Sequence, residues 1–265
     1  MNALFRTTPR LLTLLASLVL LGPSVRAKDK DNDEAGKSTA RVQFSDPAKP
    51  GTLKLSLPWA EARITATDGK EVIVTSTLDQ KGRKEVDSEG FRRIDEDVSF
   101  EVVEKNNVAT ITIAGDNQWA AQGAEFDIKV PRNTNIDVSV FSASVTVEGV
   151  EGSHKVHTFS SRVRLDDVTG PIQAHSFSGS FTIRAKAWQP DQSIDIDTFS
   201  GSVELHLPES ARGRVTFNSF SGHLNSEMPL TLHSSNRRSL SADLGSGDGG
   251  TLRFKTFSGS VKIDR

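Results

Sequence analysis

Apolar and polar side chains alternate along most of this chain with a period of two residues. The alternation is clear in "TLKLSLPW" through Leu53, Leu55 and Leu57, and in "AEFDIKVP" through Phe126 and Ile128. Successive side chains of a strand point to opposite faces, so this pattern is typical of β-strands with one buried face. After residue 27, no stretch carries an apolar helical stripe over three turns. The pattern therefore predicts an all-β protein.

The second half of the chain repeats one phrase, of which "DTFSGSVEL" at residues 197–205 is the clearest copy. Aligning the copies on their phenylalanine gives Phe141, Phe159, Phe177, Phe199, Phe220 and Phe257. The spacings are 18, 18, 22, 21 and 37 residues. Because the last spacing is nearly twice the others, we expect residues 221–256 to hide one more degenerate repeat, around "LTLHSS" or "RSLSADLG".

The apolar positions change parity at each phenylalanine. In the copy above, Ile194 and Ile196 come before Phe199, and Val203 and Leu205 follow it. A straight strand cannot change parity in this way, because a slip of one residue turns every side chain to the other face. The chain must therefore bend at the phenylalanine, and each repeat is a strand, a corner, a second strand and a second corner.

A unit of this kind cannot bury its apolar face alone, but stacked copies can. We therefore expect a single-stranded parallel β-solenoid (a β-helix) of about seven or eight short rungs over residues 131–265. Residues 41–130 alternate less regularly and are expected to form an N-terminal β cap. An antiparallel meander with a hairpin at each "FSGS" is the alternative fold.

Stacking in register would repeat equivalent residues about every 4.8 Å, the distance between paired strands. The phenylalanines are then expected to form an internal aromatic ladder, with ~0.5–1.5 kcal/mol per ring pair beyond burial. On this interpretation, Phe199→Ala costs about 3–5 kcal/mol of stability.

A serine follows every one of the six phenylalanines, and a small residue follows the serine. A catalytic serine is needed only once, so a serine at the equivalent position of all six repeats indicates a corner of the backbone rather than a nucleophile. The chain also lacks the G-x-S-x-G, H-E-x-x-H and phosphate-loop motifs. We therefore predict no enzyme activity and no cofactor. The alternative is a carbohydrate-active β-helix enzyme, a polysaccharide lyase or hydrolase, that uses acid pairs such as Asp166/Asp167 or Asp195/Asp197.

The residues two positions before each phenylalanine form one outward column. This column contains Ser139, His157, His175, Asp197, Asn218 and Lys255. In a stacked solenoid, His157 and His175 would lie about 5 Å apart, with Asp197 one rung further on. Two imidazoles and a carboxylate are ligands for zinc or another transition metal, so these three residues are the candidate metal site. The alternative is a solvated polar column.

The first 27 residues have the composition of a secretory signal peptide. Arg6 and Arg10 precede an apolar run, and "SVRA" supplies small residues for cleavage after Ala27. Residues 28–40 are charged and are expected to be a disordered linker. Cleavage removes three arginines and no acid, so the formal charge changes from −2 to −5. We therefore predict a periplasmic or secreted protein with no nucleic-acid partner and no membrane span after cleavage. The absence of cysteine excludes a lipid anchor.

The signal segment, the iterated "TFSGSV-x-L" phrase and the ending "LGSGDGGTLRFKTFSGSVKI" resemble a bacterial family of exported β-strand-repeat proteins of unknown function. The resemblance covers residues 136–265 closely, and 52–130 only by strand pattern. Members of that family are labelled as candidate adhesins, which implies a binding role. They often have Gly-Asp where this chain has Gly-Ser, so no role of that aspartate carries over.

Together these features favour an exported, non-enzymatic protein with an adhesin-like or cell-envelope scaffold role. The expected partner is a cell-envelope polysaccharide or protein. The last repeat ends at Arg265 with no sequence left for a cap. An uncapped final strand offers free backbone groups to another chain, so self-association through this C-terminal edge is a further expectation.

Overall fold

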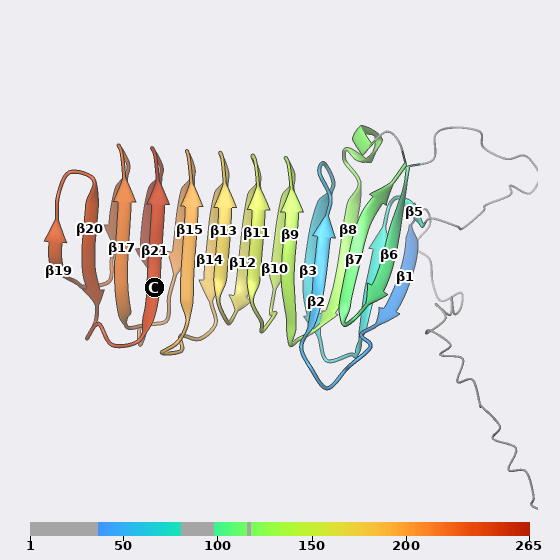
Figure 1. Ribbon diagram of the computed structural model, residues 1–265, viewed down its shortest axis with the longest axis horizontal. Helices are drawn as coiled ribbons and strands as arrows, with labels where there is room; N and C mark the ends of the chain where they lie inside the picture. Colours follow the sequence, from blue (N-terminus) through green and yellow to red (C-terminus); the bar gives the residue numbers. More distant parts are fainter. Residues whose placement is uncertain (1–36, 81–97, 116–117) are drawn as a thin grey trace, which may run out of the picture.

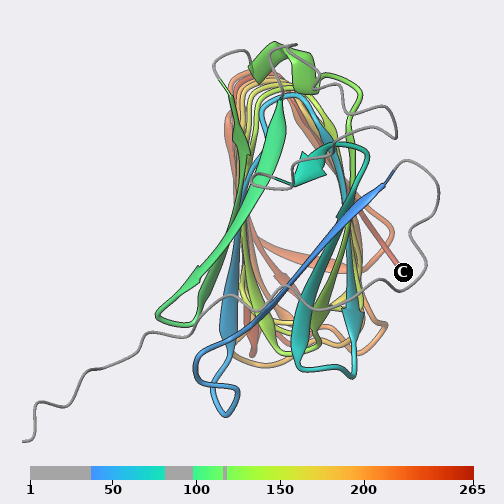
Figure 2. The same ribbon diagram turned by 90° about the vertical axis from the view of Figure 1, so that its right-hand side faces the viewer.

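The computed structural model describes residues 37–80, 98–115 and 118–265. The expected signal peptide and residues 28–36 of the expected linker lie outside these ranges. Two β-sheets face each other, and their strands stand side by side along the long axis of the molecule (Figure 1). A view along this axis shows the sheets enclosing a narrow interior (Figure 2).

Sheet A contains ten strands. In spatial order these are β1 (Ser38–Gln43), β4 (Glu71–Ser76), β8 (Glu125–Pro131), β3 (Glu61–Thr67), β10 (Ser144–Glu148), β12 (Arg162–Val168), β14 (Ser180–Ala185), β16 (Ser202–His206), β22 (Ser260–Asp264) and β18 (His223–Ser226). The first strand begins at Ser38, inside the segment expected to be a linker.

Sheet B contains twelve strands. In spatial order these are β19 (Leu230–Ser235), β20 (Ser239–Leu244), β17 (Gly213–Ser219), β21 (Gly250–Thr256), β15 (Ser193–Thr198), β13 (Ile172–Ser176), β11 (His154–Thr158), β9 (Thr134–Val140), β2 (Gly51–Ser56), β7 (Val108–Ala114), β6 (Ser99–Lys105) and β5 (Asp79–Gln80). The one helical element of the described residues is a 3-10 turn, η1 (Gln118–Ala121). None of the described helical segments has the length and apolar character needed to cross a membrane.

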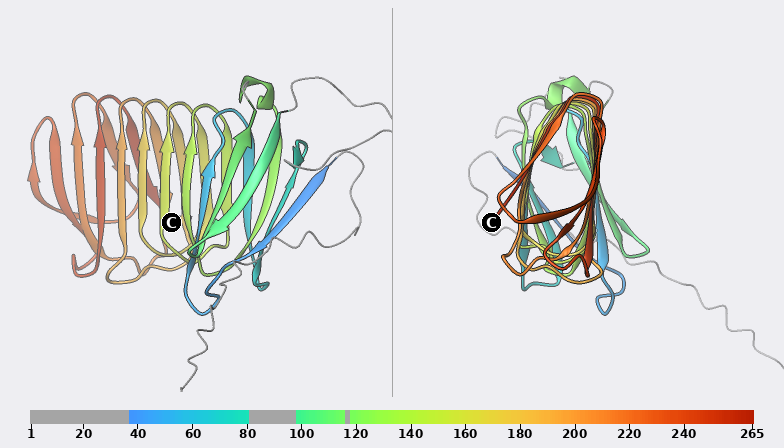
Figure 3. Two further views of the ribbon diagram at one scale, coloured as in Figure 1. Left: turned by 45° about the vertical axis from the view of Figure 1, so that its right-hand side comes forward. Right: turned by 90° about the vertical axis from the view of Figure 1, so that its left-hand side faces the viewer.

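Each turn of the chain passes from sheet B to sheet A through the phenylalanine corner, as the parity change predicts. For example, β9 leads through Phe141 to β10, and the chain returns to sheet B as β11. Neighbouring turns pair in parallel, with Val145 opposite Val163 and Val156 opposite Ala174. The stacked turns are visible in the oblique view (Figure 3). The antiparallel meander is therefore not the fold of this region.

The sheets are mixed rather than parallel throughout. Antiparallel pairs lie toward the two ends of the stack: β1 with β4, β4 with β8, β6 with β7, β17 with β20, and β19 with β20. The coil is thus a two-sheet, solenoid-like structure with hairpins at its ends. The degenerate repeat expected within residues 221–256 is not a rung, because "LTLHSS" and "RSLSADL" form the β19–β20 hairpin.

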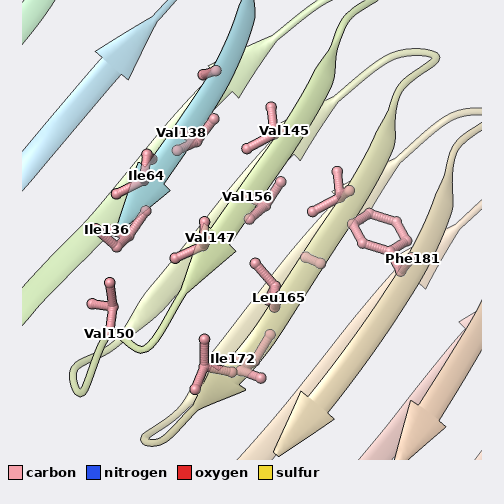
Figure 4. Packing of buried hydrophobic residues seen from close by; sticks show 14 of the residues in the cluster. Ile64, Ile136, Val138, Val145, Val147, Val150, Val156, Leu165, Ile172 and Phe181 are labelled. Carbon is pink, nitrogen blue, oxygen red and sulfur yellow. The ribbon is translucent and has the colours of Figure 1, made fainter. Parts of the chain in front are cut away.

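The core lies between the sheets and is formed by the alternating apolar positions. Val145 and Val147 of β10 face inward together with Ile136 and Val138 of β9, and all four are at most 1% exposed (Figure 4). Phe181 fills the same interior from β14. Period-two alternation therefore converts directly into a continuous apolar interior along the stack.

The phenylalanine corners are joined by backbone hydrogen bonds. The Ser178 N–H donates to the Phe159 carbonyl at 2.7 Å, and the Ser200 N–H donates to the Phe177 carbonyl at 2.8 Å. The small residue after the serine is required by close packing, because a Cβ on Gly201 would overlap the carbonyl oxygen of Gly179. The repeated "FSGS" phrase is thus a structural corner, in agreement with the sequence interpretation.

The C-terminal rung does not form an open edge, contrary to the sequence expectation. β21 inserts between β15 and β17, and β22 inserts between β16 and β18. The C terminus accordingly lies within the row of strands (Figure 1). The Leu207 N–H donates to the Asp264 carbonyl, and the Glu227 N–H donates to the Ile263 carbonyl, so both edges of the final strand are paired. The expectation of a free C-terminal edge is therefore wrong, and self-association of the protein stays a prediction that this edge does not support.

Candidate functional site

The six corner phenylalanines form a ladder on the outside of the molecule, not inside it. Each is 43–52% exposed, and consecutive rings are stacked with centroids 4.7–4.9 Å apart. The spatial order is Phe141, Phe159, Phe177, Phe199, Phe257 and Phe220. The spacing of the rings agrees with the repeat, but the expectation of an internal ladder is wrong, because every ring is exposed on the outer side.

The strand that enters each corner explains why the phenylalanine points outward. In β9, Ile136, Val138 and Val140 are buried, so alternation places Phe141 on the opposite, outer side. The bend that changes the parity comes only after this residue. Because the rings face solvent along one edge and stack on each other across their faces, they form a continuous apolar ridge of ring edges.

Two tryptophans extend this ridge at its N-terminal end. Trp59 follows β2, and its ring centroid lies 4.7 Å from that of Phe141. Trp119 of η1 stacks on Trp59, with the two ring centroids 4.1 Å apart. Trp119 is 62% exposed. At the other end, the Arg238 guanidinium lies 4.4 Å from the centroid of Phe220. We call the eight rings, Trp119, Trp59, Phe141, Phe159, Phe177, Phe199, Phe257 and Phe220, the aromatic ridge.

A groove of about 690 Å³ runs beside the N-terminal half of the ridge. One wall is made by the rings of Phe141, Phe159 and Phe177, and the other by the column that contains His157 and His175. Trp59 lies toward one end of the groove, beside Phe141, and Asp197 lies toward the other, next to His175. We call this feature the histidine groove.

The two histidines lie as the stacking argument predicts. Their ring centroids are 5.3 Å apart and their planes are 12° from parallel. Burial, followed by the nearby His175 and Lys155, holds the pKa of His157 below its usual value. The imidazole of His157 is therefore neutral at pH 7 and can both donate and accept a hydrogen bond.

The metal interpretation of His157, His175 and Asp197 stays a prediction. The lone pair with which an imidazole nitrogen binds zinc lies in the plane of the ring, and the two stacked rings have planes only 12° from parallel, so their lone pairs do not converge on one ion in this arrangement. The Asp197 carboxylate instead accepts from the Lys255 ammonium at 3.3 Å. Within the described ranges, no group of three or more His, Cys, Asp or Glu side chains is arranged to hold a metal ion.

A second, more polar trough of about 450 Å³ lies on the other side of the corner. It is lined by serine and glycine columns, including Ser178, Gly179 and Ser180. At Gly179 and Gly201 the neighbouring turn packs so closely that an added Cβ would overlap its backbone oxygen. This trough presents hydroxyl groups at every turn and no acid or histidine among its lining residues.

Three of the four outward acids weighed for catalysis, Asp166, Asp195 and Asp197, are held in ion pairs. The Asp166 carboxylate contacts both Arg164 and Arg184, and these hydrogen bonds keep its pKa below the usual value although burial acts in the opposite direction. The Asp195 carboxylate accepts from Arg253 at 2.8 Å. A carboxyl group with a lowered pKa is poorly suited to act as a general acid near neutral pH.

Sequence reasoning did not identify Trp59, Trp119 or Arg238 as parts of the site. Neither tryptophan lies in a copy of the repeated phrase. In the structure, the Pro58 carbonyl accepts hydrogen bonds from the N–H groups of Phe141 and Ser142, so Pro58 and Trp59 stand at the corner of the neighbouring turn. The sequence signal for this corner is only its position, directly after the alternating apolar residues that end at Leu57.

A sequence model of the family described as Toastrack DUF4097 matches residues 25–264. No curated protein matches the chain significantly. Among solved structures, a candidate cell adhesion protein from Clostridium sporogenes is similar at 10% identity and a TM-score of 0.46, over 86% of this chain and 99% of that chain. A candidate adhesin from Bacteroides fragilis is similar at 12% identity and a TM-score of 0.29, over 86% and 96%. A candidate adhesin from Parabacteroides merdae has 9% identity and a TM-score of 0.27, over 88% and 98%.

Proposed function

The chain belongs to the Toastrack DUF4097 family, a family of unknown function, and we propose that it is an exported, non-enzymatic binding protein of the cell envelope. It engages its partner in an adhesin-like manner through the aromatic ridge. The rigid, two-sheet stack serves as the scaffold that holds the ridge straight. The setting is the periplasm or the cell exterior, as the signal-like first 27 residues indicate.

The observation that carries this proposal is the exposure of the ridge. Six phenylalanines in one row are each 43–52% exposed, although the core between the sheets is complete without them. Large apolar side chains that gather on one surface commonly mark a site of interaction. Aromatic rings are suited to this role, because they contribute large contact area and have few rotamers to lose on binding.

Two features support a binding role over an enzymatic one. The outward acids Asp166 and Asp195 are neutralised by arginine partners. The serine that follows each phenylalanine uses its backbone N–H for the corner ladder, and it occurs at every turn rather than at one special turn. A carbohydrate-active enzyme would need one turn whose polar residues depart from this pattern.

The proposal is tested by sedimentation of the purified chain, residues 28–265, with insoluble bacterial envelope material. We expect the wild-type chain to sediment with the envelope fraction and the Phe159→Ala/Phe177→Ala variant to remain in the supernatant. A matched control is Thr146→Ala/Thr182→Ala, which changes two half-buried outward positions of sheet A away from the ridge.

Equal sedimentation of the wild type and the ridge variant would contradict the proposed role of the ridge. Release of shortened glycans from the envelope material would contradict the non-enzymatic assignment. Circular dichroism of each variant before the assay confirms that the fold is retained.

A further inference from the structure

We propose that the histidine groove binds a linear, uncharged polysaccharide chain that lies along the stacking axis. This inference rests on the proposed binding function and names the class of partner. It is carried by three properties of the groove: its two chemically different walls, its nearly balanced charge and its repeat.

The two walls match a ligand that is apolar on one side and rich in hydroxyl groups on the other. The ridge wall presents the ring edges of Phe141, Phe159 and Phe177, which form an apolar surface. The opposite wall presents the His157 and His175 imidazoles, which can donate and accept hydrogen bonds. A sugar chain offers C–H groups to the first wall and hydroxyl groups to the second. An acyl chain would leave the imidazole wall without partners.

The charges around the groove nearly cancel. Asp197 is paired with Lys255 at its end. On the neighbouring strands Asp195 is paired with Arg253. Asp137 of β9 lies between Lys54 of β2 and Lys155 of β11, which leaves an excess of one positive charge. The lowered pKa of His157 keeps that ring uncharged at neutral pH. A single excess charge is too little to attract a polyanion with a charge on every unit, so an uncharged polymer fits best.

The repeat of the groove fits a polymer of rings better than a peptide. The ridge rings recur every 4.7–4.9 Å and the two imidazoles lie 5.3 Å apart. One rung is therefore about as long as one sugar unit in an extended chain. An extended peptide repeats its side chains on one face about every 6.6–6.8 Å, out of register with the rungs. Strand addition is also blocked, because β9, β11 and β13 are already paired on both edges.

The test is affinity electrophoresis at pH 7.5 through gels that contain one soluble polysaccharide each. The uncharged probes are mixed-linkage β-glucan, galactomannan and dextran, and the acidic probes are alginate and polygalacturonate. We expect retardation by at least one uncharged polysaccharide and none by the acidic ones. Phe159→Ala and His175→Ala should each weaken binding about tenfold, which corresponds to ~1.4 kcal/mol.

Leu232→Ala is the matched control, because Leu232 is an exposed apolar side chain of β19 that belongs neither to the ridge nor to the lining of the groove. Its binding should stay within about twofold of the wild type. Equal weakening by Leu232→Ala would overturn the assignment to the groove. Wild-type binding to the envelope fraction without binding to any uncharged polysaccharide overturns this inference and leaves the proposed function intact. Failure to bind either material overturns both.

Discussion

Because the ladder lies on the outside, each of its rings contributes less to the free energy of unfolding than a phenylalanine of the core. Phe177 is 47% exposed and stacks on Phe159 and Phe199, each at 4.9 Å. Its burial is about half complete, which contributes about 1 kcal/mol on the usual area scale. Two stacking contacts at the lower end of the usual range add ~0.5 kcal/mol each. Removal of the ring opens the site to water and leaves no cavity. Phe177→Ala should therefore lower the free energy of unfolding by about 2 kcal/mol.

The reference variant is Phe181→Ala, four residues away. Phe181 is 1% exposed in the core, so its truncation leaves a cavity and should cost about 4 kcal/mol. Both values can be measured by urea unfolding at 25 °C, followed by circular dichroism. The double variant Phe177→Ala/Phe199→Ala should cost less than the sum of its single variants, because the two rings share one contact. A loss from Phe177→Ala as large as that from Phe181→Ala, or below about 0.5 kcal/mol, would refute this reasoning.

Three further outcomes follow from the structure. Deleting residues 250–265 removes a rung that is paired on both sides in both sheets, so we expect loss of cooperative unfolding in thermal scans. Gly201→Ala forces a methyl group onto the Gly179 carbonyl and should lower the melting temperature, whereas Ser200→Ala at the exposed neighbour should not. Burial lowers the pKa of His154 to about 4, below its unfolded value of 6.5. The contribution of neutral His154 to the free energy of unfolding is therefore fully present above pH 6.5, and it should decrease by about 3 kcal/mol as the pH falls to 4. In urea titrations at each pH, His154→Gln should show a smaller decrease than the wild type.

Local alternation was sufficient to predict the strands and the corner, and it also contained the answer that the sequence interpretation missed. Val138 and Val140 face the core, so Phe141 must face outward by the same period-two rule. The prediction of an internal ladder follows from the apolar character of phenylalanine and disregards its place in the alternation. The error shows that side-chain direction follows from the backbone period, even where hydrophobicity favours the interior.

The order of the rungs could not be read from the sequence, because it depends on pairing between distant strands. The spacing of 37 residues before Phe257 predicts a hidden rung. It instead covers the β19–β20 hairpin and the return of the chain to the gap between β15 and β17. Local pattern does not specify which neighbour a strand selects among several with the same apolar face.

The candidate site was predicted in part. The stacking of His157 on His175 followed from the repeat spacing alone. The contribution of Trp59 and Trp119 did not, because β2 and β7 enter the stack from a region with no copy of the phrase. The ion pair of Asp197 with Lys255 depends on the inserted last rung, so the sequence order placed these residues too far apart.

Oxidative footprinting with and without the envelope fraction tests the central claim most directly, because it reports the exposure and the protection of each ring in one experiment. In the free protein, we expect Phe141, Phe159 and Phe177 to be oxidised readily, and the buried Phe126 and Phe181 to resist. On addition of envelope material, the three ridge rings should become protected while outward positions elsewhere stay reactive. Ridge rings that remain as reactive in the presence of a bound partner as in its absence would contradict the account.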